Sequence, residues 1–300
     1  MRVLHCNRKS GPSLIQDRTH PLRGIGLMLL AVSTFSCLDA TAKYLAADYA
    51  VPTIVWARYV FQMLLMVVLL GPRMGRGLLR TTSLRLQIVR GMVLTASSLA
   101  FLSALARMPL AEAASIAFMA PLFIAVLSGP VLHERVERRT WLALAAGFVG
   151  VMLIVRPGGA LFTWVALLPL ASALMMAVYQ MMTRRLAARD SALTTLFYPA
   201  LVGSLAVPLA FPVSFSLPGD PVHLAMFGAL GVLGGIGHFF LIRAHFHAPA
   251  SVLGPFMYGQ LVTALALGWL VFGQLPDAPA ILGMLFITGS GLALAFSHRR

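Results

Sequence analysis

Two polar side chains lie inside stretches that are otherwise apolar, and each could take part in binding or proton chemistry. Asp39 is deep in an apolar run, where a carboxylate costs at least about 2.5–3.5 kcal/mol unless it faces a cavity or a partner. It could bind a substrate amine or a proton, or it could form an ion pair with Lys43 on the same helical face. His238 follows Gly234-Gly235-Ile236-Gly237. It could hydrogen-bond a carboxylate, respond to pH, or be satisfied by a neighbouring helix.

Aromatic and amide side chains accompany two prolines in apolar stretches. Tyr258 and Gln260 follow Pro255, and Phe118 precedes Pro121. A proline inside a helix frees a backbone carbonyl, which a membrane tolerates where it lines a cavity. Tyr258 offers an apolar face and a hydroxyl, which would suit a zwitterion with a variable side chain. The alternative for Tyr258 is a contact between helices. We expect the two prolines to lie where helices bend to open and close a gate.

Five further residues complete the candidate set. Tyr179 and Gln180 are predicted to bind substrate or to join helices. Ser98 is either a cavity donor or a small residue at a helix contact. Trp56 and Arg58 open an apolar stretch, where they are typical of an interfacial aromatic belt with an extended arginine. They could also form an external gate in which the guanidinium holds a carboxylate.

Other chemistries lack the residues they need. His245 and His247 form an H-x-H pair without a third ligand, so no metal is expected. The chain has no H-E-x-x-H, no G-x-S-x-G, no paired aspartates and no Walker motif, so we expect no catalytic residues and no cofactor. A membrane-embedded enzyme is the main alternative class, and it would need converging ionisable groups. Energy for any transport would come from a gradient, or the protein would act as a facilitator.

Composition indicates a membrane protein. Of the 300 residues, 59% are hydrophobic and only 11% are charged, whereas soluble domains carry about 25% charged residues. A helix needs about 20 mainly apolar residues to cross a bilayer, so about ten crossings fit. We expect spans at 22–42, 53–71, 86–106, 110–132, 141–156, 163–183, 193–212, 222–244, 249–272 and 278–297. Only Met108-Pro109 interrupts 86–132, so that stretch could also be one bent hairpin.

The net charge of +14 has a topological explanation. The basic residues lie between apolar blocks, where anionic head groups attract them, so the expected partner is a lipid bilayer and not nucleic acid. With ten spans, all 23 basic residues fall on the side of the N-terminus except Lys43, Arg58, Arg107 and Arg156. The positive-inside rule then predicts that both termini lie in the cytoplasm. Arg90 is counted with the basic loop that precedes the third span.

The two halves of the chain repeat one another. One fixed offset along the chain brings Pro109 onto Pro249, Phe118 onto Tyr258, and Ser98 onto His238, and a slightly longer offset brings Asp39 onto Gln180. Each half has five spans, an odd number, so the second must enter the membrane from the opposite side. Such inverted repeats support alternating access, with a site between the halves near the midplane. We predict an all-α membrane protein with a basic arm (1–21), two five-helix repeats (22–157 and 158–297) and a tail (298–300).

Two related motifs occupy corresponding places in the halves. In the first, Met108-Pro109-Leu110-Ala111-Glu112-Ala113-Ala114 leads through Phe118-Met119-Ala120-Pro121-Leu122-Phe123 to His133-Glu134-Arg135-Val136. In the second, Ala248-Pro249-Ala250-Ser251 leads to Gly273-Gln274. The pattern resembles the doubled EamA-type unit of the drug/metabolite transporter superfamily, over about residues 22 to 297. Gln274 replaces the usual glutamate and His133 the usual glycine.

The resemblance implies a secondary transporter for a small molecule. It is similar to the amino-acid and metabolite exporters of bacterial inner membranes, such as the YddG-type exporters of aromatic and other neutral amino acids. Outward movement of amino acids is therefore expected, and a carrier for another metabolite or drug class is the alternative. Because one chain contains both halves, a monomer is expected. A channel or structural subunit would not need an inverted repeat.

Overall fold

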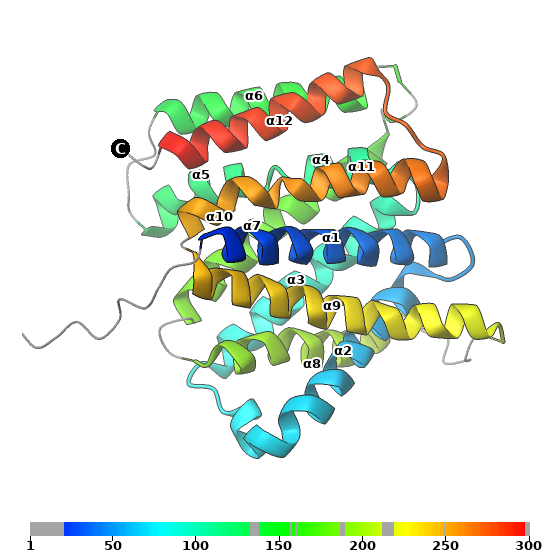
Figure 1. Ribbon diagram of the computed structural model, residues 1–300, viewed down its shortest axis with the longest axis vertical. Helices are drawn as coiled ribbons and strands as arrows, with labels where there is room; N and C mark the ends of the chain where they lie inside the picture. Colours follow the sequence, from blue (N-terminus) through cyan, green and yellow to red (C-terminus); the bar gives the residue numbers. More distant parts are fainter. Residues whose placement is uncertain are drawn as a thin grey trace, which may run out of the picture.

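The protein is a bundle of membrane-length helices, seen in a computed structural model (Figure 1). The structure describes residues 21–132, 138–156, 158–159, 161, 163–186, 190–211, 219–248 and 250–297, and within them every regular element is helical. The first half contains α1 (Pro21–Leu45), α2 (Val51–Met74), η1 (Gly75–Leu79), α3 (Leu84–Leu105), α4 (Leu110–Ala117), α5 (Ala120–Leu132) and α6 (Arg138–Val155). The second contains η2 (Trp164–Ala166), α7 (Leu167–Leu186), α8 (Ala192–Ala210), α9 (Pro221–His247), α10 (Ala250–Met257), α11 (Gly259–Phe272) and α12 (Ala278–Ser297).

The helices agree with the predicted spans. Within the described ranges, nine segments are long and apolar enough to cross a membrane, and a shorter apolar stretch, Ala278–Leu294, supplies the tenth. The doubtful stretch 86–132 contains two crossings, because α3 ends at Leu105 and Pro109 precedes α4. The all-α membrane fold is thus confirmed. Most of the basic arm and tail, together with His133, Glu134 and Pro249, lies outside the described residues.

The fourth and ninth spans are each broken into two helices. The first break falls at Phe118 and Met119, between α4 and α5, and the second at Tyr258, between α10 and α11. Pro121 has no N–H to donate to the carbonyl four residues earlier, and its ring crowds that carbonyl, so the helix cannot continue unchanged. At the second break, Gly259 follows Tyr258 directly, and glycine favours a helix about 1 kcal/mol less than alanine.

The packing of the two halves is reciprocal. Helix α1 packs on α9 and α7 packs on α3, while α2 contacts α9 and α8 contacts α3. Helix α1 also contacts α10 and α11, just as α7 contacts α4 and α5. Two further contacts, α2 with α8 and α6 with α12, pair corresponding helices directly. Exchanging the halves reproduces this list, as a two-fold inverted repeat requires.

Helices α6 and α12 meet backbone to backbone. A Cβ added to Gly150 would lie 2.6 Å from the carbonyl oxygen of Gly283, and a Cβ added to Gly283 would lie 2.5 Å from that of Gly150. Only glycine fits such a crossing, which is a common way for membrane helices to pack closely. The two halves therefore touch at this point without side chains between them.

The two ends of the bundle differ in their number of basic residues. At the end where α1 begins and α12 ends, which we call the basic end, the exposed cations among the described side chains are Arg23, Arg73, Arg80, Arg85, Arg138, Arg139, Arg185 and Arg243. It lies on the left in Figure 1. The opposite end has Lys43, Arg107 and Arg156. One assignment to the ends was wrong, because Arg90 is fully buried within α3. Arg58 lies inside α2, in the part of the helix nearer the opposite end.

Candidate functional site

A small polar cavity lies between α1, α2 and α3, toward the opposite end. Its volume is about 20 Å³, which is room for about one water molecule. The polar members of its wall are Asp39, Arg58 and Ser98. The apolar members are Leu38, Ala42, Ile54, Val55, Phe101, Leu102 and Leu105. The helices are thus closed around these polar groups, and no metabolite fits between them without helix movement.

Asp39 is held by contacts between α1 and α11. The Gln260 side-chain amide donates a hydrogen bond of 3.3 Å to Asp39 Oδ2. About one turn earlier on α1, the Ser36 hydroxyl lies 2.7 Å from the Thr263 hydroxyl and donates to the carbonyl of Gln260 at 3.1 Å. These bonds fix the polar face of α1 against α11. They leave Asp39 on the cavity wall, about 9 Å before the end of its helix.

Lys43 does not form the ion pair considered for it with Asp39. Its Nζ donates to the carbonyl oxygens of Leu105 and Met108 at 2.7 and 2.6 Å. Leu105 is the last residue of α3, where a cation is stabilised by the partial negative charge of the helix end, and Met108 lies in the turn that follows. The pair is therefore absent between these two described side chains. Asp39 faces the cavity without a lysine partner.

Arg58 brings the opposite charge to the same cavity. Its guanidinium carbon lies 5.6 Å from the centre of the Tyr59 ring, and its Nε is buried without a hydrogen-bond partner among the described residues. No direct ion pair joins these described side chains, Arg58 and Asp39, although both line the cavity. The Tyr59 hydroxyl lies 2.8 Å from the Ser98 hydroxyl. The cavity therefore presents a cation, an anion and an oriented hydroxyl.

The two aromatic residues at the helix breaks meet each other. The ring centres of Phe118 and Tyr258 are 5.1 Å apart, with 37° between the ring planes. The Tyr258 hydroxyl is buried, lacks a hydrogen-bond partner among the described residues, and points at Gly291 of α12, where a Cβ would overlap it. Neither ring is part of the small cavity wall. Pro121 begins α5 just after the first break, and Pro255 is inside α10.

The remaining candidates are dispersed over the bundle. His238 packs its ring against Phe35 of α1, with the ring centres 5.0 Å apart. Trp56 Nε1 donates to the carbonyl of Ser204 on α8 at 3.1 Å, and Gln180 is exposed. The structure therefore brings Asp39, Ser98, Arg58 and Gln260 together. It does not place the other predicted site residues around the same cavity.

Sequence reasoning missed a buried arginine cluster in the half of α3 nearer the basic end. Arg90 donates from Nη1 to the Thr183 hydroxyl at 3.0 Å and from Nη2 to the carbonyl of Thr195. Its guanidinium lies over the Tyr179 ring, 4.9 Å from the centre, and its Nε has no partner among the described residues. The available signal was that Arg90 lies several residues inside an apolar span, beyond the polar loop that precedes it.

The repeat relates this cluster to the small cavity. The longer of the two repeat offsets brings Leu38 onto Tyr179, Ala42 onto Thr183, and Ile54 onto Thr195. The first residue of each pair lines the cavity, and the second contacts Arg90. The Arg90 guanidinium, which comes from α3 of the first half, therefore contacts the positions of α7 and α8 that correspond to part of the cavity wall on α1 and α2.

At the basic end, the connection between α7 and α8 is bonded to the start of α3. Asp190 accepts hydrogen bonds from the Thr81 hydroxyl, from the backbone N–H and hydroxyl of Thr82 at 2.9 and 3.0 Å, and from the Gln87 amide at 2.8 Å. Partial burial works to raise the pKa of Asp190, but these hydrogen bonds outweigh it and lower the pKa to about 2.

The opposite end is closed in a corresponding way. The Tyr49 hydroxyl, in the connection between α1 and α2, lies 3.1 Å from Nδ1 of His223 on α9. The Tyr49 ring also packs edge-on against Phe227, with the centres 5.0 Å apart. Because α1, α2 and α9 correspond to α7, α8 and α3, the two closures are repeat equivalents. Arg156 and Asp277 form an additional ion pair there, between the two halves.

Comparison with known proteins identifies the family. The EamA-like transporter family matches residues 22–156 and again residues 163–296. The chain is 30% identical to a riboflavin transporter of Vibrio cholerae, covering 92% of this chain and 93% of that protein. It is also 30% identical to the pseudopaline exporter CntI of Pseudomonas aeruginosa (91% and 95% covered) and 24% identical to an S-adenosylmethionine uptake transporter of Rickettsia prowazekii (93% and 94% covered).

A solved structure described only as a protein shares the fold. Its TM-score is 0.60 at 20% sequence identity, covering 94% of this chain and 99% of that one. Together with the double family match and the helical bundle, these similarities confirm the resemblance drawn from the motifs. The chain belongs to the EamA-like transporter family and is a multi-pass membrane transporter, not an enzyme.

Proposed function

We propose that this carrier moves small metabolites that bear both an ammonium group and a carboxylate, such as neutral amino acids, by alternating access. The proposal rests chiefly on one observation. Asp39 and Arg58 line the same cavity with opposite charges, yet they do not form a direct ion pair. In this proposal the substrate amine binds Asp39 and the substrate carboxylate binds Arg58.

The energetics of buried charge favour such a ligand. A charged side chain inside a membrane protein is costly unless it meets a partner or faces water. The unpartnered Nε of Arg58 leaves part of its planar donor set free, and guanidinium groups bind carboxylates through two parallel hydrogen bonds. A zwitterion would supply the missing partner to each side chain at once, with the Ser98 hydroxyl as a further polar contact.

Closure at both ends supports a carrier in preference to an open channel. The cavity has room for about one water, and a polar cluster closes the bundle on either side of it. A substrate must therefore enter by separation of helices. The breaks at Phe118 and Tyr258 divide the fourth and ninth spans into segments that can tilt separately, which is a recurrent device in alternating-access carriers.

The relatives support small-molecule transport. The proposed substrate class is inferred from the opposite charges of Asp39 and Arg58. The names of the relatives include riboflavin, S-adenosylmethionine and pseudopaline, and the relatives include both an uptake transporter and an exporter. The resemblance to amino-acid exporters implies outward movement, so the liposome test described below measures transport in both directions. We further propose that the monomer is the transport unit, and that the basic end faces the cytoplasm of a bacterial inner membrane.

The test uses the purified full chain in liposomes. Labelled neutral and aromatic amino acids, S-adenosylmethionine and riboflavin are offered from either side, with and without a pH gradient. We expect at least one zwitterion to move, and we expect Asp39→Asn and Arg58→Gln to lower its rate at least about tenfold, equivalent to about 1.4 kcal/mol. Arg85→Gln, at an exposed position, is the matched control and should transport normally. Wild-type rates in both cavity variants, or movement of riboflavin alone, would refute the proposed substrate site.

A further inference from the structure

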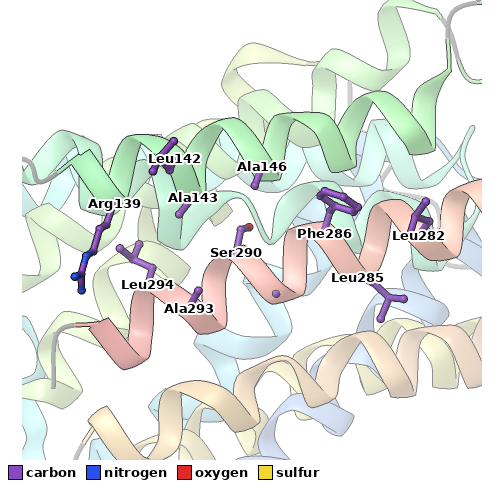
Figure 2. A pocket seen from close by; sticks show the side chains of 11 residues that line it. Arg139, Leu142, Ala143, Ala146, Leu282, Leu285, Phe286, Ser290, Ala293 and Leu294 are labelled. Carbon is purple, nitrogen blue, oxygen red and sulfur yellow. The ribbon is translucent and has the colours of Figure 1, made fainter. Parts of the chain in front are cut away.

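A large apolar groove runs between α6 and α12. Figure 1 shows this helix pair at the edge of the bundle. The volume of the groove is about 720 Å³. Figure 2 shows Ala143 and Ala146 of α6 on the side nearer α12, Leu294 and Phe286 of α12 on the side nearer α6, and Arg139 at one end. Arg139 is the only charged residue that lines the groove, within the part of the chain that the structure describes.

The groove follows from how these two helices pack. They touch at Gly150 and Gly283, which lie toward the opposite end. From there to the basic end, small residues leave space between the helices: a Cβ added at Gly289 would meet no atom within 4 Å. The wall residues Leu142 and Leu285 are 69% and 62% exposed. The groove is therefore open to whatever surrounds this helix pair.

In a membrane, the surroundings of this helix pair are lipid. The lining residues of α12 run from Leu282 to Leu294, a length of about 18 Å along the helix. This is comparable with about 15 Å, half the thickness of the hydrocarbon core. Arg139 is in the first turn of α6, at the basic end, which is the level of the head groups. The groove thus has the length of an acyl chain and a cation at its head-group end.

We propose that this groove binds an anionic phospholipid of the leaflet at the basic end. One acyl chain lies between α6 and α12, and the head-group phosphate binds Arg139. Basic pockets between membrane helices recognise anionic head groups in this way, and guanidinium groups match phosphate geometry. An exposed cation at the head-group level, at one end of an otherwise apolar groove, favours a lipid over a second copy of the chain.

Lipid retention provides the test, independently of transport. The full chain is released from vesicles of equal phosphatidylglycerol and phosphatidylethanolamine into detergent, and bound lipid per chain is measured by native mass spectrometry. We expect retained phosphatidylglycerol in the wild type. Arg139→Gln should weaken its binding about fivefold, the effect of one basic residue near an anionic head group. Gly289→Leu should fill the groove and remove lipid of either head group.

Two matched variants control for charge and bulk. Arg85→Gln removes an exposed cation at the same end but outside the groove. Gly228→Leu adds the same side chain on α9, where a Cβ also meets nothing within 4 Å. Both should retain phosphatidylglycerol as the wild type does. Equal retention of the two lipids, or wild-type retention by Arg139→Gln and Gly289→Leu, would overturn the proposal. A two-chain particle that Gly289→Leu separates would instead make this face a dimer interface.

Discussion

The rings of Phe118 and Tyr258 lie 5.1 Å apart, and each is located at the break of its own half. The offset that brings Pro109 onto Pro249 also relates these two residues, so the contact joins repeat-equivalent positions across the two halves. Both broken helices must change their tilt if the halves are to exchange roles. Such a movement would therefore change the contact between the two rings, and replacing one of the rings tests the role of the breaks.

Replacing Tyr258 separates the role of its ring from that of its hydroxyl. Tyr258→Ala removes the ring contact and should slow transport while expression stays normal. Tyr258→Phe keeps the ring and should transport normally. It should also stabilise the protein by about 1 kcal/mol, because a buried hydroxyl without a partner costs about 1–3 kcal/mol. Transport in liposomes and thermal unfolding in detergent measure the two effects. Equal slowing in both variants would contradict this account of the ring.

Gly291 should be intolerant of a side chain. In Gly291→Ala the new Cβ overlaps the Tyr258 hydroxyl, and we expect destabilisation of about 1–3 kcal/mol. The double variant with Tyr258→Phe should recover part of that loss, because the overlap with the hydroxyl is removed while ring carbon Cζ stays 2.6 Å from the new Cβ. Thermal unfolding would measure the recovery. The control is Gly289→Ala, two residues away on the same helix, where a Cβ meets nothing. Independent, additive effects of the two changes would disprove the overlap.

Lysine should not substitute for Arg90. The planar guanidinium of Arg90 bonds the Thr183 hydroxyl and the carbonyl of Thr195 while it lies over an aromatic ring. The compact ammonium group of lysine has no such plane and cannot make all three contacts at once. We expect Arg90→Lys to destabilise the protein by about 1.5–3 kcal/mol. Arg85→Lys, at an exposed position one to two turns earlier, should change stability by less than about 0.5 kcal/mol. If Arg90→Lys changes stability as little as Arg85→Lys does, the positive charge alone is what matters at position 90.

The closure at Asp190 should be insensitive to pH over the physiological range. Its hydrogen bonds depress its pKa to about 2, below about 3.9 for an unfolded aspartate. A depressed pKa stabilises the fold above the unfolded value, and this contribution is lost as pH falls toward the folded value. Asp190→Asn should therefore lower the unfolding temperature by a constant amount from pH 8 to pH 5, and by less below pH 4. A difference that varies between pH 8 and pH 5 would be inconsistent with the low pKa.

Local features of the sequence predicted most of the fold. The length of each apolar run and the glycines and prolines between runs limit where a helix can begin and end, so the helices follow the predicted spans. Pro121 also indicated the first break, because the loss of its N–H acts on its own helix. The reciprocal packing was predictable because the two halves repeat one another and each crosses the membrane five times. This prediction needs no knowledge of side-chain contacts.

The site could be predicted only in part, because side-chain partners depend on contacts between helices. Lys43 was considered as a partner for Asp39 because of their spacing along the helix. In the structure its amine instead donates hydrogen bonds to carbonyl oxygens at and just after the end of α3. Arg90 was assigned to a loop because arginine in an apolar span is rare. Its hydroxyl and carbonyl partners come from α7 and α8, in the other half of the chain.

The Arg90 cluster makes the two halves unequal although their folds match. The first half keeps a small void lined by charged groups, whereas the equivalent positions of the second half are covered by the Arg90 guanidinium, which comes from α3 of the first half. A carrier built from identical halves would populate its two orientations equally. One whose pockets differ has a resting bias, and each difference of about 1.4 kcal/mol shifts the populations tenfold. In a carrier that works by alternating access, this difference between the halves would set which side the empty protein faces at rest.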